Sequence, residues 1–215
     1  MAGTESTQAH RKGTTIEQEI LQLERELDDA IFDLYDLNTA ERDLIRDMCD
    51  VGMDFLYSGK SSSAVKPVVV PPKSSGVEAD VSGAQSGMGA YLKTFLQIWN
   101  QNLDTDAELS WHLLSPDVQA PLLAVLFSAQ AKSKPLVPSD PNNNWTKVLA
   151  ILDKSSFQTA GSRQIYTDSF VRLVNEEDEI LLIKRNEVRF WTRSAAREDA
   201  EATQLQAMRL QEATA

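Results

Sequence analysis

The sequence has little of what export and metal-dependent catalysis usually require. Its 215 residues include one cysteine and two histidines, too few for an internal disulfide or for a zinc site built from His and Cys. No apolar run approaches the roughly 18 residues that span a bilayer, and the first residues lack the pattern of a signal peptide. We therefore expect a cytoplasmic protein with no metal and no other cofactor.

Motifs of catalytic sites are also missing from the sequence. It has no glycine-rich phosphate loop, no Gly-x-Ser-x-Gly and no His-Glu-x-x-His. Cys49 falls among the apolar positions of an expected helix and is interpreted as a core residue, and His112 falls on an expected strand and is interpreted as an ordinary surface or edge residue. The acidic run at 176–179 is interpreted as a solvated turn. Without a nucleophile–base pair, the sequence predicts a protein that is not an enzyme.

The acidic charge of the chain is concentrated in one segment. The formal net charge of the whole chain is −11, and residues 14–57 alone carry −10. The remainder is therefore close to neutral, and the low isoelectric point does not by itself exclude contact between that remainder and DNA.

Two amphipathic helices are predicted in the acidic segment. Thr14 and Glu17 have the spacing of a capping box, and Asn38 and Glu41 repeat that spacing. Between these caps, apolar residues recur in steps of four and three, which places them on one face of a helix. This apolar stripe consists of Ile16, Ile20, Leu23, Leu27, Ala30, Ile31 and Leu34.

The two helices would form an acidic hairpin over residues 14–57, the second helix ending near Tyr57. The stripe would be buried within the chain or by a partner, either another protein or a second copy. We favour a partner, because a pair of helices has little core of its own. The residues expected to bind the partner are Ile20, Leu23, Leu27, Ile31, Leu34 and Tyr35.

Composition divides the chain into four parts. Residues 1–13 are polar and expected to be a disordered tail. The hairpin at 14–57 is followed by a segment rich in Ser, Pro and Gly at 58–86, which is typical of a flexible linker. Residues 87–211 would form the second domain.

The second domain is predicted to have the order α-β-β-α-β-β-α, an α+β fold with a mainly antiparallel sheet. Strands and helices are distinguished by their apolar periodicity, and Asn144 and Ser194 are expected to cap the last two helices. Helices are expected at 88–102, 145–157 and 194–211, and strands at 108–114, 122–129, 164–174 and 179–184, with a turn at 175–178.

A basic segment lies at residues 184–197. It carries a net charge of +4, and two aromatic residues lie among its basic residues. Basic groups can hold phosphates, aromatic rings can stack on bases, and a helix N-terminus favours anions. In the alternative interpretation, the rings are core and the arginines pair with nearby carboxylates. The candidate nucleic-acid-binding residues are Lys184, Arg185, Arg189, Trp191, Arg193 and Arg197.

Several stretches carry a resemblance to a known family. The stretch LERELDDAIFDLYDLNTAERDLI (23–45) resembles the helical tail of bacterial N6-adenine DNA methyltransferases of restriction-modification and phage-defence systems. The stretches at 91–104, 122–130 and 181–207 look like the C-terminal region beyond the methylase domain of large defence proteins. The family's S-adenosylmethionine motif and its Asn/Asp-Pro-Pro-aromatic motif are both absent, since Pro71-Pro72 is followed by Lys73.

The resemblance thus implies a non-catalytic portion of a methylation module. The leading hypothesis is an accessory subunit of an N6-adenine methylation or restriction-type defence complex, whose hairpin docks on the DNA methyltransferase subunit and whose second domain aids DNA recognition or assembly. The alternative is a self-associating scaffold protein with no nucleic-acid role. An unrecognised nuclease is a weaker third interpretation.

Overall fold

A computed structural model of the chain describes residues 3–71, 80–115, 120–132, 144–154, 170–175 and 179–214. Contacts divide the chain into two compact units, Met1–Ile45 and Arg46–Ala215. The division lies inside the second predicted helix and not in the segment 58–86.

The first unit is dominated by a long helix, α1, which spans Gly3–Leu34. The prediction of a disordered tail is wrong for residues 3–13, and Thr14 lies inside the helix, so it does not cap the start. The reason is local propensity: the upstream residues include helix formers such as Gln, Ala, Arg and Lys, which extend the helix beyond its apolar stripe.

The turn after α1 is a Schellman motif in which an aspartate occupies the left-handed position. Asp36 has a φ of 52°. The N–H of Leu37 donates to the carbonyl of Phe32 at 3.0 Å, and the N–H of Asp36 donates to the carbonyl of Asp33 at 3.1 Å. These two bonds satisfy carbonyls that the helix end would leave unpaired.

Helix α2 (Thr39–Asp47) begins with the predicted capping box. The amides of Ala40 and Glu41 donate to the side-chain oxygen of Asn38 at 2.9 and 3.1 Å, and the Glu41 carboxylate accepts from the Asn38 amide at 2.8 Å. This prediction is confirmed, because such a cap depends only on residues that are adjacent in sequence.

Arg42 ties the first turn of α2 to the last turn of α1. Its guanidinium donates to the Asp33 carboxylate at 2.7 Å and to the carbonyl of Leu37 at 2.7 Å. The same group lies 5.8 Å from the centre of the Phe32 ring.

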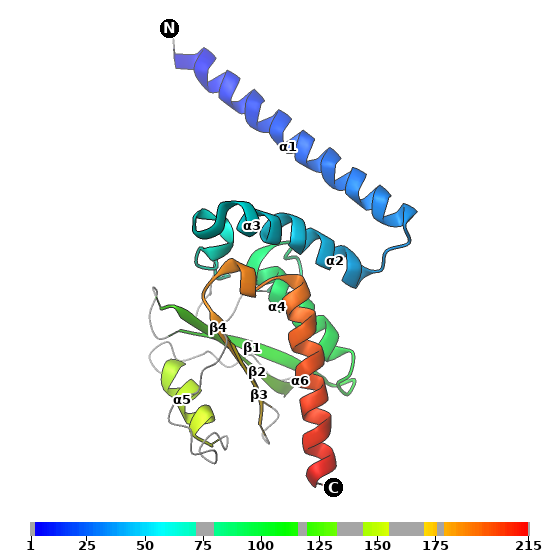
Figure 1. Ribbon diagram of the computed structural model, residues 1–215, viewed down its shortest axis with the longest axis vertical. Coiled ribbons are helices and arrows are strands. Elements are labelled where there is room, and N and C mark those ends of the chain that lie inside the picture. Colours follow the sequence, from blue (N-terminus) through cyan, green and yellow to red (C-terminus); the bar gives the residue numbers. More distant parts are fainter. Residues whose placement is uncertain are drawn as a thin grey trace. The chain divides into compact units, whose positions relative to one another are not determined.

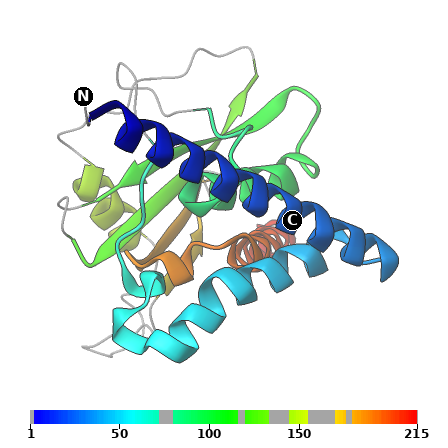
Figure 2. The same cartoon turned by 90° about the horizontal axis from the view of Figure 1, so that it is seen from above.

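The second predicted helix continues as a π-helix, η1 (Met48–Met53), and a short helix, α3 (Asp54–Ser58). Cys49 lies in η1 and is exposed, so the prediction that it is a core residue is wrong. Figure 2 shows these turns following one another in cyan. Two 3-10 turns come next, η2 (Gly59–Ser61) and η3 (Ser63–Val65).

The Asp54 carboxylate holds the chain in place where it leaves α3. It accepts hydrogen bonds from the hydroxyls of Ser62 and Ser63 at 2.6 and 2.7 Å and from the Ser63 amide at 2.8 Å. The bonds from Ser62 and Ser63 lower the pKa of Asp54 well below that of an ordinary aspartate, because they stabilise the charged form.

The prediction of a flexible linker at 58–86 is wrong where the structure describes that segment. Ala64, Val68 and Val81 are buried, and the last two belong to the main core. The Val68 amide also donates to the Asn186 side chain at 3.0 Å. Composition suggested a linker, but a few apolar residues among the Ser, Pro and Gly insert into the domain. Residues 72–79 lie outside the described part.

The four-stranded sheet confirms the predicted α+β class. Every strand pair is antiparallel, in the order β1-β2-β4-β3, so the apolar runs of β2 and β4 are central. The predicted strands at 108–114, 122–129 and 179–184 are confirmed. The strands span Ala107–Leu114 (β1), Leu122–Ala131 (β2), Phe170–Val174 (β3) and Glu179–Arg185 (β4). The predictions for 155–157, 164–169 and 176–178 lie outside the described residues.

Helices cover both faces of the sheet (Figure 1). On one face, α4 (Gly87–Asn100) and α6 (Arg193–Thr214) pack on the side chains that include Val125 and Phe127. On the other, α5 (Asn144–Lys154) packs on residues such as Leu126. The alternation along β2 thus divides the core into two layers.

Candidate functional site

Lys184, the first residue of the basic segment, is buried at 4% exposure. Its ammonium forms an ion pair with Asp199 and donates to the carbonyl of Phe190 at 3.0 Å. It also lies 5.0 and 5.3 Å from the rings of Tyr91 and Trp191. Burial lowers the pKa of Lys184, an effect that the Asp199 charge opposes. The prediction that Lys184 contacts nucleic acid is therefore wrong.

Trp191 is buried at 1% exposure. Its indole N–H donates to the carbonyl of Arg185 at 2.9 Å, and its ring packs edge-on against Tyr91 with centroids 5.0 Å apart. A base could not stack on a ring enclosed in this way, so the prediction that Trp191 binds nucleic acid is also wrong.

Asp199 is the centre of this buried polar cluster. Its carboxylate accepts from the Tyr91 hydroxyl, from Lys184 and from Nε of Arg172, the last at 2.7 Å. Arg172 also pairs with Glu198 at 2.6 Å. Burial raises the pKa of Tyr91 well above its ordinary value, and Asp199 raises it further. The cluster joins α4, β3, β4 and α6.

The arginines of the segment are partly engaged within the domain. Arg189 bonds to the Glu187 carboxylate at 2.8 Å, and Arg193 donates to the carbonyl of Gln85 at 2.6 Å. Arg185 is exposed, 3.7 Å from Glu187. That these arginines contact nucleic acid stays a prediction. The same holds for Arg197, which lies on the same face of α6 as Arg193 because the helix begins at Arg193.

The N-terminus of α6 already holds a carboxylate of this chain. The Asp47 side chain accepts from the Ser194 amide at 2.6 Å. The Thr192 hydroxyl accepts from the Ala195 amide at 3.3 Å, so the cap is Thr192 and the prediction of Ser194 is wrong. A phosphate at this helix end would have to displace Asp47, which occupies the position that favours an anion.

The apolar stripe of α1 is exposed along its length. The exposed fractions of the six predicted partner-binding residues range from 42% for Ile31 to 80% for Leu34. Neither the rest of α1 nor the start of α2 covers this face. We call it the α1 face; its members are Ile16, Ile20, Leu23, Leu27, Ala30, Ile31 and Leu34.

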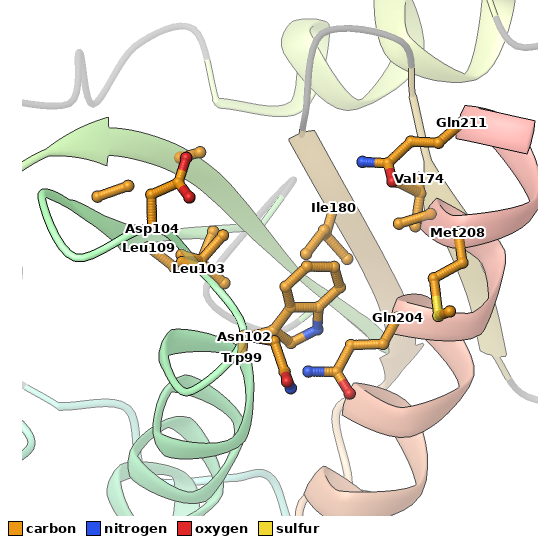
Figure 3. A pocket seen from close by; sticks show the side chains of 13 residues that line it. Trp99, Asn102, Leu103, Asp104, Leu109, Val174, Ile180, Gln204, Met208 and Gln211 are labelled. Atoms are coloured by element: carbon orange, nitrogen blue, oxygen red, sulfur yellow. The ribbon is translucent and has the colours of Figure 1, made fainter. Parts of the chain in front are cut away.

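A cavity of about 640 Å³ lies between the end of α4, the sheet and α6. Figure 3 shows Trp99, Ile180 and Met208 among the side chains around it. Among the described residues of its lining, Asp104 is the one titratable residue, so these residues hold no acid–base pair. Sequence reasoning did not predict this cavity, since no motif marks it.

Polar groups at the cavity are engaged in packing the two helices. The Trp99 indole N–H donates to the Thr203 hydroxyl at 3.0 Å, and the Gln204 side chain donates to the carbonyl of Ile98 at 3.2 Å. Asn102 donates to the same carbonyl at 3.3 Å. The cavity can accommodate an apolar group, and each of these polar side chains already makes a hydrogen bond within the chain.

Metal-binding clusters and membrane-spanning helices are both absent from the described ranges. Among those residues, no group of three or more His, Cys, Asp or Glu side chains could hold a metal ion. No helix in the same ranges is both long enough and apolar enough to cross a bilayer. Comparison of the chain with family models, curated proteins and solved structures found no match.

Proposed function

We propose that this chain is a non-catalytic accessory subunit that docks on a DNA methyltransferase subunit through the α1 face. It would act in an N6-adenine methylation or restriction-type phage-defence complex. The single observation that carries the docking role is the exposure of the α1 face, whose large apolar side chains include Leu23, Leu27 and Leu34.

An exposed stripe of this length is costly to leave in water. Each large aliphatic side chain gains about 1.5–3 kcal/mol when it is fully buried, and helices draw most of their stability from packing an apolar face. A contiguous exposed apolar surface is typical of a protein–protein interaction site. The identity of the partner rests on the resemblance of residues 23–45 to methyltransferase tails.

The contribution to DNA recognition is narrower than the sequence alone suggested. Lys184 and Trp191 are buried, so a DNA surface on this domain would use the more exposed groups of the segment, led by Arg185. Assembly of the complex is therefore the main role that we propose.

The docking role predicts that a DNA methyltransferase subunit is encoded in the same gene neighbourhood and co-purifies with this chain when the two are co-expressed. Leu27→Asp combined with Ile31→Asp places two charges on the α1 face and should abolish co-purification. The matched control is Leu21→Asp, because Leu21 is 52% exposed but lies off the stripe. Its co-purification should be unchanged.

Two results would count against the proposal. Undiminished co-purification of the double variant would remove the α1 face from the interface. Concentration-dependent self-association through the α1 face, with no methyltransferase bound, would favour the scaffold alternative.

A further inference from the structure

We propose that the α1 face is selective for a partner helix flanked by lysine or arginine and rejects a second copy of this chain. This inference rests on the proposed docking function and specifies the chemistry of the partner. It follows from the residues that border the apolar stripe.

The stripe has the spacing of a coiled-coil seam. Ile20, Leu27 and Leu34 are seven residues apart and occupy one seam position, while Ile16, Leu23 and Ala30 occupy the other. The e and g positions next to the seam face the corresponding positions of a partner helix. All six of these seam side chains, from Ile16 to Leu34, are exposed, so they are available to a partner.

The positions that border the seam are almost uniformly acidic. With the seam assigned in this way, one flank contains Glu17 and Glu24 and the other contains Glu19 and Glu26. We call these four residues the flanking carboxylates. Asp33 continues the second flank but pairs with Arg42 of the next helix at 2.7 Å. The one basic side chain of this stretch, Arg25, lies away from the seam.

A second copy of α1 would bring like charges together in either orientation. Parallel helices place g positions against e positions, and antiparallel helices place like positions together, so carboxylates would face carboxylates in both cases. Like charges at such positions are destabilising and are used to exclude unwanted partners.

A helix with Lys or Arg at its own e and g positions would instead be attracted to this surface. Its cations would pair with the flanking carboxylates while its apolar residues cover the seam. At the C-terminal end of α1, Ile31 replaces a carboxylate in the first flank. The apolar surface is wider there, so the partner should present its largest apolar side chains opposite Leu27, Ile31 and Leu34.

The test uses the full chain and two labelled helical peptides of about three heptads each, long enough to pair with the seam. Both carry Ile and Leu at seam positions; one has Lys and the other Glu at the flanks. Fluorescence anisotropy should show the Lys peptide binding at least about tenfold more tightly. This preference should shrink as salt is raised. Equal binding of the two peptides, or binding of neither, would overturn the inference.

Charge reversal provides a matched pair of variants. Glu19→Lys with Glu26→Lys should abolish the preference between the peptides, because the reversed charges on one flank then offset Glu17 and Glu24 on the other. The control is Asp28→Lys with Asp29→Lys, which changes the net charge by the same amount but off the seam, and should keep the preference. Loss of the preference in both pairs would show an effect of net charge alone and would contradict the inference.

Sedimentation tests the rejection of a second copy. The native chain should be monomeric, whereas Glu19→Gln with Glu24→Gln and Glu26→Gln should self-associate because the repulsion is removed. A native dimer that is lost on Leu27→Asp would overturn the inference.

If the methyltransferase docks through the α1 face but the peptides are not discriminated, this inference alone fails. If the Lys peptide is preferred but the methyltransferase does not bind, the proposed function alone fails.

Discussion

Asp199 receives hydrogen bonds from three side chains on three different elements: Tyr91 of α4, Arg172 of β3 and Lys184 of β4. A carboxylate with no exposure to solvent is stable only when such partners replace the lost hydration. The basic segment was interpreted as a nucleic-acid surface, with core rings and pairing to nearby carboxylates as the alternative, because sequence shows the charges but not that Tyr91 and Arg172 meet at the same buried carboxylate. Tyr91 lies 108 residues away from Asp199.

Removal of Lys184 should therefore be strongly destabilising. Lys184→Met leaves the Asp199 charge buried with one partner fewer, and breaking a buried pair costs roughly 3–5 kcal/mol. Lys147→Met is the matched control, because Lys147 pairs with Glu179 at 3.0 Å but is half exposed, and exposed pairs contribute about 0–1 kcal/mol. Denaturant unfolding measures both variants. Equal losses would contradict the structural role of the buried cluster.

At the scale of helices and strands, the sequence pattern correctly predicted features that depend only on residues close together in the sequence. The strands at 108–114 and 179–184 and the cap at Asn38 and Glu41 are confirmed, since apolar patterning and capping are local properties. The prediction of a linker at 58–86 failed in its described parts because burial of Val68 and Val81 depends on tertiary packing. The start of α1 was placed too late because the cap signal at Thr14 competes with helix formers before it.

The turn between α1 and α2 offers a prediction for these elements. Asp36 adopts a φ of 52°, a conformation that costs roughly 1–2 kcal/mol for most residues, less for Asp, and little for Gly. Asp36→Gly should slow exchange of the Leu37 amide, which bonds to the Phe32 carbonyl, and Asp36→Val should accelerate it. Hydrogen exchange by NMR measures both. Faster exchange in the Gly variant would contradict the Schellman geometry.

At the scale of the whole molecule, the negative charge and the exposed apolar face of α1 lie in the same segment of the chain. Residues 14–57 hold −10 of the net charge of −11, and the α1 face lies within the same segment. The α+β unit has a two-layered core and a closed polar cluster. The sequence could predict both the apolar stripe and its acidic borders, because each depends on helical spacing alone. It could not predict the cavity beside Trp99, which is formed by residues from Trp99 to Gln211.

The central claim is that a partner covers the α1 face, and hydrogen exchange across residues 16–34 tests it most directly. In the isolated protein these amides should exchange faster than those of β2 and β4, because a helix with an uncovered apolar face opens readily. With the methyltransferase subunit bound, their exchange should slow markedly. Strong protection already present in the isolated chain, or exchange that the methyltransferase leaves unchanged, would contradict the account.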